Sequence, residues 1–265
     1  MDQLIFLVSY GSGLWIAALV AIFSALRWFF VPADRKRAEL LLIASIYLQG
    51  ATYFSNWAAD SLSNLRPLKY DLYVYRFDSI FGEPSFRLGQ IVLPNHWLCA
   101  LMQVTYTSLT AAMLGTFAVY LWLRPKREVI RVARTFVLSV FLAVGIYLLF
   151  PVCGPEFAFP QFPQLPSAHL TPHLILINAA PNGVPSVHTS TALLVLWFLR
   201  PWRWGRFVGT IFLALTVLAT KSGGQHYFFD LLCAVPYTVG IVWLDQRLES
   251  WLTARPATAY LVQTE

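Results

Sequence analysis

Long apolar stretches alternate along this chain with short clusters of polar and charged residues. A helix needs roughly 20 consecutive apolar residues to cross the hydrocarbon core of a bilayer, so each long apolar stretch predicts a membrane-spanning helix. The pattern predicts seven such helices, at about residues 4–31, 38–59, 96–123, 135–150, 186–199, 207–220 and 226–244. The expected fold is therefore all-α, a polytopic membrane helical bundle that forms a single integral membrane domain over residues 1–265.

Two longer segments do not follow the apolar pattern. Residues 61–95 mix basic and aromatic side chains, which is typical of a layer at the lipid headgroups, and we expect them to form an extracytoplasmic segment. Residues 151–185 contain many prolines and therefore cannot form one long straight helix. We expect this second segment to be an ordered extracytoplasmic cap over a site on the helices of residues 186–245.

The composition independently indicates a membrane protein. Hydrophobic residues make up 57% of the chain and charged residues 12%, and the mean hydropathy is +0.58, values that exclude an ordinary soluble enzyme. The net charge of +6 would suggest a nucleic-acid partner in a soluble protein. Here the cations lie at the ends of the apolar stretches, so they indicate topology, and we expect the lipid bilayer and no nucleic acid as a partner.

Cysteine and histidine spacings outside the main motifs do not predict a disulfide or a metal site. The three cysteines, Cys99, Cys153 and Cys233, are far apart and unpaired in spacing. His169 and His173 are separated by a proline that interrupts any helix between them, and we interpret them as surface residues.

The distribution of basic residues predicts an orientation. The first apolar stretch is too long for a cleaved signal peptide, and its basic residues follow it, so we expect a helix that enters the membrane from outside. With seven spans, the amino terminus is then outside and the carboxyl terminus cytoplasmic, in a plasma or inner membrane. Five of the 19 basic residues fall on the outer side, namely Arg66, Lys69, Arg76, Arg87 and Lys221.

The segment ATKSGGQHYFFDLLCA, residues 219–234, places a histidine and an aspartate in apolar sequence. His226 and Asp230 are four residues apart, a spacing that brings two side chains onto one face of a helix. A carboxylate so placed can keep one imidazole nitrogen protonated and leave the other free to attack an electrophile. The alternative is that His226 is an interfacial histidine and Asp230 a polar residue at a helix end.

The segment PNGVPSVHTS, residues 181–190, combines turn residues with a serine that can cap the helix after it. The start of a helix favours a phosphate or an oxyanion, because its backbone N–H groups are free and the helix dipole is positive there. His188 lies in the predicted first turn, where it could protonate a leaving oxygen. Two histidines beside an anion site suggest phosphoryl transfer.

GVPSVHTS followed by GQHYFFD resembles the second and third motifs of the type 2 phosphatidic acid phosphatase superfamily, and most closely its inositol phosphorylceramide synthase-like branch. The resemblance covers roughly residues 147–235 and, more weakly, the segment FDSIFGEPS at residues 77–85. It implies a six-helix phosphatase-like core and a phosphohistidine intermediate. It also implies that His226 is the nucleophile, Asp230 its orienting carboxylate and His188 the general acid, with no metal or other cofactor.

The chain departs from this family at the residues that hold the phosphate. The first motif of the family is a lysine followed, after six residues, by Arg-Pro, but Ala59 and Phe117 stand at the two places where the lysine is required. The third motif usually has an arginine ahead of its histidine, and Lys221 is the only cation in that part of this chain. We therefore expect Lys221, with backbone amides near Gly183 and Ser186, to bind the substrate phosphate.

The expected function is that of a lipid phosphate phosphatase or phosphotransferase, acting on a membrane lipid phosphoester from the extracytoplasmic side. Water would make the enzyme a hydrolase, whereas an alcohol acceptor, either a lipid or a polyol, would make it a transferase. The alternative is a non-catalytic transporter or lipid-binding protein with a polar cavity. That alternative gives no reason for two histidines, an aspartate and a capped helix start on the same side.

Overall fold

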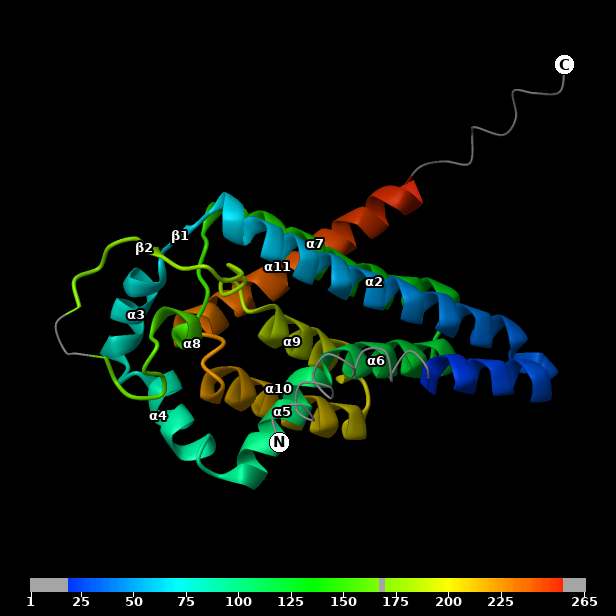
Figure 1. Cartoon of the computed structure of the whole chain (residues 1–265). Coiled ribbons are helices and arrows are strands. Elements are labelled where there is room, and N and C mark those ends of the chain that lie inside the picture. Colours follow the sequence, from blue (N-terminus) through cyan, green and yellow to red (C-terminus); the bar gives the residue numbers. More distant parts are fainter. Residues whose placement is uncertain (1–18, 167–169, 255–265) are drawn as a thin grey trace, which may run out of the picture.

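The computed structural model describes residues 19–166 and 170–254, and the regular structure in these ranges is almost entirely helical (Figure 1). The predicted all-helical class is thus confirmed, apart from one ladder of two short strands. In chain order the elements are an apolar helix Leu19–Phe30, the 3-10 turn η1 (Pro32–Asp34), α2 (Arg35–Leu65), β1 (Leu68–Lys69), α3 (Asp71–Ile80), α4 (Pro84–Val92), α5 (His96–Thr107), α6 (Leu109–Leu123), α7 (Lys126–Leu149), α8 (Pro155–Ala158), β2 (Ile175–Leu176), α9 (Val187–Leu199), α10 (Arg203–Ser222) and α11 (Phe228–Ala254).

Two of the described helices, α7 and α11, are long and apolar enough to cross a membrane. The pair α5 and α6 is a third candidate, but the two helices are bent by 52° where we expected one continuous span over 96–123. The predicted count of seven spans is therefore not confirmed. Most of the first predicted span, residues 4–31, lies outside the described residues.

The bend between α5 and α6 has a local cause. Ser108, at the junction, donates its hydroxyl proton to the carbonyl of Thr105 at 2.8 Å, and Thr107 donates to the carbonyl of Gln103 at 3.0 Å. Side chains that bond back to the preceding turn compete with the helical ladder and bend helices. The apolar pattern continues through this point, so the pattern alone does not reveal the bend.

The bundle is built around apolar side chains of α2, α6, α7, α9 and α11. Leu48, Phe117, Phe136 and Leu194 belong to one buried cluster in which each is at most 4% exposed. Helices α2 and α7 lie side by side along one side of the bundle (Figure 1). At one end, Asp245 of α11 is buried and paired with two arginines of α7, Arg131 at 2.9 Å and Arg134 at 2.6 Å.

The opposite end of the bundle carries a small outer layer of α3, α4, α8 and the strands (Figure 1). The strands β1 and β2 pair antiparallel, with Leu68 opposite Leu176. A second apolar cluster, which includes Leu72, Phe86, Phe159 and Tyr227, packs this layer against the start of α11. The proline-rich segment is largely non-helical, as its composition predicts, and the candidate site lies where this layer meets the starts of α9 and α11.

Candidate active site

His226 and Asp230 form a buried pair. The Nδ1 atom of His226 lies 3.3 Å from Oδ2 of Asp230, and the two residues are 3% and 0% exposed. Helix α11 begins only at Phe228, so His226 lies in the loop before the helix and not on the helical face that we expected. Asp230, in the first turn, reaches back to this loop and also accepts the backbone N–H of Tyr227 at 2.8 Å.

The loop that carries His226 depends on its glycines. The backbone N–H groups of Gln225 and His226 both donate to the carbonyl of Thr220, at 3.1 and 3.2 Å. This fold-back requires Gly224 to adopt a φ of 68°, a left-handed conformation that favours glycine. A Cβ atom at Gly224 would also lie 2.8 Å from the ring of Phe162, which is too close.

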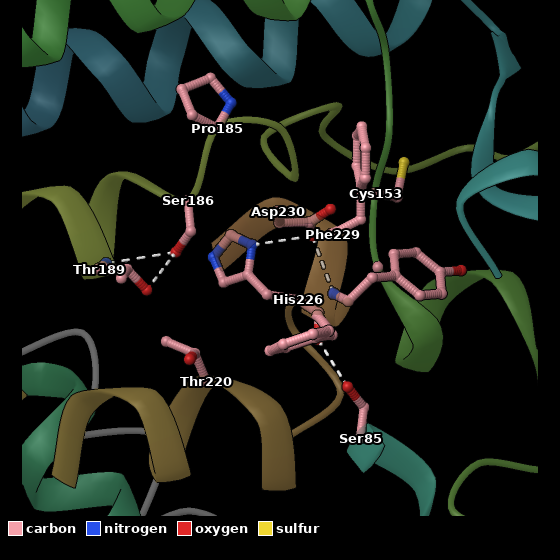
Figure 2. Close-up of polar contacts among 12 residues, drawn as sticks. Ser85, Cys153, Pro185, Ser186, Thr189, Thr220, His226, Phe229 and Asp230 are labelled. Atoms are coloured by element: carbon pink, nitrogen blue, oxygen red, sulfur yellow. Dashed lines mark hydrogen bonds and ion pairs between the residues drawn. The ribbon is translucent and has the colours of Figure 1, made fainter. Parts of the chain in front are cut away.

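His188 lies in the first turn of α9, as the sequence predicts. Ser186 is the N-cap of this helix, and its Oγ accepts the backbone N–H of Thr189 at 3.3 Å. The rings of His188 and His226 have centroids 5.9 Å apart. Tyr106 of α5, which sequence reasoning did not single out, stacks on His188 with a centroid separation of 4.0 Å. The two motifs therefore meet, with the nucleophile candidate facing the start of α9 (Figure 2).

Lys221 lies in the last turn of α10 and is 4% exposed. Its Nζ lies 4.7 Å from the ring centroid of Phe228 and has no hydrogen-bond partner among the described residues. The carboxylates of Asp78 and Asp230 attract this charge from a distance, but neither accepts a hydrogen bond from Nζ, so an anion that enters the site could supply the missing acceptor. This lysine was expected in the turn before His226, but α10 continues through it.

The other two expected phosphate ligands are engaged within the protein. The N–H of Gly183 donates to the carbonyl of Val152 at 2.7 Å, and the N–H of Ser186 donates to the carbonyl of Asp230 at 3.3 Å. Within residues 19–166 and 170–254, no acceptor faces the N–H groups of Val187 and His188. These two amides, at the start of α9, are therefore available to an anion.

The imidazole of His226 is held in its neutral form. Burial lowers its pKa to about 4, the backbone of Gly183 partly opposes this effect, and the positive charge of Lys221 lowers the pKa further. A neutral ring whose Nδ1–H points at Asp230 has its lone pair on Nε2. Figure 2 shows the second ring nitrogen on the side of Ser186 and Thr189. The pair can therefore attack an electrophile bound at the start of α9.

Two aspartates of α3 were not recognised from the sequence. Asp71 and Asp78 are 0% and 2% exposed, and burial raises the pKa of each carboxyl group to about 6. They are seven residues apart, a spacing that places them on one helix face, and this was the available signal.

The remaining candidate groups do not join the site. His173 is exposed, with Nδ1 2.8 Å from the carbonyl of Thr171, and His169 lies outside the described residues. Lys69 is fully buried and donates to the carbonyl of Arg66. In the described part of the chain there is no group of three His, Cys, Asp or Glu residues that could hold a metal ion. Lys221 is a buried cation whose charge acts on His226 and whose Nζ has no hydrogen-bond partner among the described residues.

The apolar helices and the site together indicate a helical integral membrane protein in which two histidine motifs lie next to each other. A family model of the PAP2 superfamily matches residues 73–244, well over half of the chain, so the chain belongs to that superfamily. Its members are generally phosphatases, which supports an activity on phosphate esters. Comparison with curated proteins and with solved structures gave no match. The match is to the superfamily as a whole, and the inositol phosphorylceramide synthase-like branch stays a prediction.

Proposed function

We propose that the protein transfers a phosphoryl group from a membrane lipid phosphoester through a phosphohistidine at His226. The observation that carries the proposal is the buried pair of His226 and Asp230, 3.3 Å apart, which faces His188 at the start of α9. Membership of a superfamily that acts on phosphate esters supports the same chemistry.

In the first step, Nε2 of His226 attacks phosphorus and the P–O bond to the leaving alcohol breaks. His188 gives its proton to the leaving oxygen, so the alcohol departs neutral. Asp230 accepts the Nδ1–H of His226 and stabilises the positive charge that develops on the ring. The products are a free lipid alcohol and phosphohistidine.

In the second step, the acceptor attacks the phosphohistidine and the P–N bond breaks. His188, now neutral, takes the proton of the acceptor hydroxyl and is restored to its starting state. Water as the acceptor gives a phosphatase, and a lipid or polyol alcohol gives a phosphotransferase. Neither step requires a metal or cofactor from outside the chain.

Charge on the equatorial oxygens of the phosphoryl group must be neutralised during both steps. Lys221 supplies a buried positive charge, and the N–H groups of Val187 and His188 point out of the start of α9. We assign Ser186 and Gly183 to shaping this site, because their amides are already donated to Asp230 and Val152. Helix α9 adds the positive end of its dipole.

We place the site on the extracytoplasmic side of the membrane, in a protein with seven spans. The start of α11, where the site lies, and the second half of α11, which carries Asp245, lie toward opposite ends of the bundle (Figure 1). In most multi-pass proteins the cytoplasmic side carries an excess of Lys and Arg. The sequence pattern assigns 14 of the 19 basic residues of this chain to the cytoplasmic side, and Arg131 and Arg134 are among them. The substrate would then be a lipid of the outer leaflet.

Trapping of the intermediate tests the proposal. Purified protein in detergent is mixed with lipids labelled at phosphorus, namely phosphatidic acid, diacylglycerol pyrophosphate, polyprenyl phosphates, and phosphatidylinositol with a ceramide or sugar acceptor. We expect acid-labile, base-stable label on the wild type, none on His226→Gln, and full label on the exposed control His173→Gln. Asp230→Asn should label about 10³-fold more slowly, because the imidazole loses its orienting carboxylate.

Retention of label in His226→Gln would remove that residue from the role of nucleophile. Absence of label and turnover with every substrate, in folded wild-type protein, would favour the non-catalytic alternative. The same assay identifies the acceptor, because transfer to water releases inorganic phosphate whereas transfer to a lipid alcohol forms a new phospholipid.

A further inference from the structure

Three side chains of one outer segment converge on the loop that carries His226. Asp78 of α3 accepts the backbone N–H of Phe228 at 2.7 Å and that of Phe229 at 3.1 Å, one with each carboxylate oxygen. Ser85 of α4 donates its hydroxyl proton to the carbonyl of His226 at 2.9 Å (Figure 2). Asp71 accepts the hydroxyl of Tyr227 at 3.1 Å.

These contacts join parts of the chain that are far apart in sequence. The bonds from Asp78 and Ser85 span 141 to 151 residues, and the bond from Asp71 spans 156. Each of the three side chains is at most 2% exposed. Ser85 binds the carbonyl of His226, Asp78 binds the amides of Phe228 and Phe229, and Asp71 binds the side chain of Tyr227, so the loop is held at three points.

Asp78 acts as the N-cap of α11 although it belongs to another helix. A helix start has free N–H groups that need acceptors, and a side chain just before the helix usually supplies one. In α11 the acceptor is the carboxylate of Asp78, so this helix start is already occupied. At the start of α9, in contrast, the amides of Val187 and His188 have no acceptor among the residues that the structure describes.

The two helix starts at the site therefore have different roles. One binds a carboxylate of the protein, which fixes where α11 begins and how His226 lies relative to Asp230. The other is available for the reacting phosphate. A buried carboxylate costs free energy unless it is hydrogen-bonded, and burial does raise the pKa of Asp78. The two hydrogen bonds from the amides of Phe228 and Phe229 offset this cost in part and fix where α11 begins, which supports a positioning role.

We propose that Asp78 is a positioning residue of the reaction, which acts through the amides of Phe228 and Phe229 to hold the ring of His226 at its attack distance from phosphorus. The inference rests on the proposed function. Asp78 does not itself contact the substrate. A loop displacement of about 1 Å at a reacting group can lower a rate by roughly 100-fold, so the effect should appear in kcat and not in substrate binding.

The test is Asp78→Asn, which keeps the shape but replaces one acceptor oxygen with an NH₂ group that faces a backbone N–H. We expect kcat to fall by about 10- to 100-fold, with KM within about twofold of the wild type and phosphohistidine formation slowed to match. Asp60→Asn, an exposed change of the same type on α2, is the matched control and should leave both parameters unchanged.

Hydrogen exchange provides a readout that does not depend on activity. The amides of Phe228 and Phe229 should exchange at least tenfold faster in Asp78→Asn, because they lose a carboxylate acceptor, while amides of α7 should be unchanged. Ser85→Ala is the second variant if Asp78→Asn does not fold. It should give a smaller fall in kcat, about three- to tenfold, with faster exchange of the same loop.

The possible results separate the two proposals. Wild-type kcat in folded Asp78→Asn, or a raised KM with unchanged kcat, would overturn the positioning role while leaving phosphohistidine chemistry intact. If the loop exchanges faster in Asp78→Asn but the wild type never forms phosphohistidine, the proposed function is overturned. The contact of Asp78 with α11 would then have no role in catalysis. Unchanged exchange at Phe228 and Phe229 would refute the capping contact directly.

Discussion

At the scale of single residues, Lys221 gives a direct test of phosphate binding. If its unpartnered ammonium contacts the phosphoryl group, Lys221→Met should cost about 2 to 4 kcal/mol of transition-state stabilisation. Lys221→Arg should retain part of this, since it keeps the charge. The measurement is kcat/KM in detergent on a water-soluble phosphate ester. Wild-type activity of Lys221→Met would mean that another cation, starting with Arg66, Arg76 or Arg87, holds the phosphate.

His188 is tested by changing the leaving group. As general acid it should matter most for an alkyl alcohol, which leaves poorly, so His188→Gln should lower kcat/KM for a lipid phosphate by about 100-fold or more. Nitrophenyl phosphate has a better leaving group and needs less proton donation, so kcat/KM of His188→Gln for this substrate should fall by less than about tenfold. The ratio of the two losses is the measurement. Equal losses on both substrates would assign His188 to binding instead.

The pH dependence of stability follows from the lowered pKa of His226. The folded protein holds this ring neutral down to about pH 4, whereas the unfolded ring protonates near 6.5, so its contribution to stability is present above 6.5 and is lost as the pH falls toward 4. Between about pH 8 and pH 5 the loss is roughly 2 kcal/mol.

His226→Gln should remove this loss. The variant should therefore gain stability relative to the wild type on acidification, measured as Tm in detergent at about pH 8 and pH 5. Asp71 and Asp78 act in the opposite direction, since their raised pKa values make acid stabilising, and they do so equally in both proteins. Parallel Tm changes in the two proteins would contradict the neutral ring.

At the scale of elements, the proline-rich segment of residues 151–185 can approach the loop of His226 closely because residue 154 is a glycine. Its φ is 128°, and a Cβ atom there would lie 2.4 Å from the carbonyl oxygen of Gln225. We expect Gly154→Ala to lower the free energy of unfolding by about 2 to 4 kcal/mol, since both strain and a backbone clash oppose it. Gly145→Ala in α7, where the added atom meets nothing within 4 Å, is the control and should be neutral or slightly stabilising.

The starts and bends of the helices differ in how far the sequence predicts them. The start of α9 was predictable because its signals are local, a turn followed by a capping serine, and so was the meeting of two histidine motifs. The start of α11 was not, because its cap comes from Asp78, which lies 150 residues earlier. The bend at Ser108 was also missed, since serine and threonine do not interrupt an apolar pattern. The hydrogen bond from the N–H of Gly183 to the carbonyl of Val152 could not be predicted either, because it depends on a tertiary contact.

At the scale of the whole molecule, the orientation in the membrane stays a prediction that labelling can test. Arg87→Cys, on α4, should react with a membrane-impermeant maleimide in intact cells, whereas Arg247→Cys, on α11, should react only after permeabilisation. Both positions are exposed, so accessibility from the correct side is not limited by packing. The parent protein, with Cys99, Cys153 and Cys233 in place, gives the background. The reverse pattern would place the site in the cytoplasm.

In the proposed topology, the length of α9 sets how deep in the membrane the reaction would take place. Its 13 residues span about 20 Å, which is roughly 10 Å less than the hydrocarbon thickness of a bilayer. If the Arg200 end of this helix lies at the cytoplasmic interface, the free amides of Val187 and His188 at its other end lie well below the extracytoplasmic interface. A long-chain lipid can bend its polar end into such a recess while its tails remain among their neighbours. A small water-borne ester would make the same contacts with Lys221 and the amides but has no tails to hold it at the membrane, so we expect it to be turned over more slowly than a lipid.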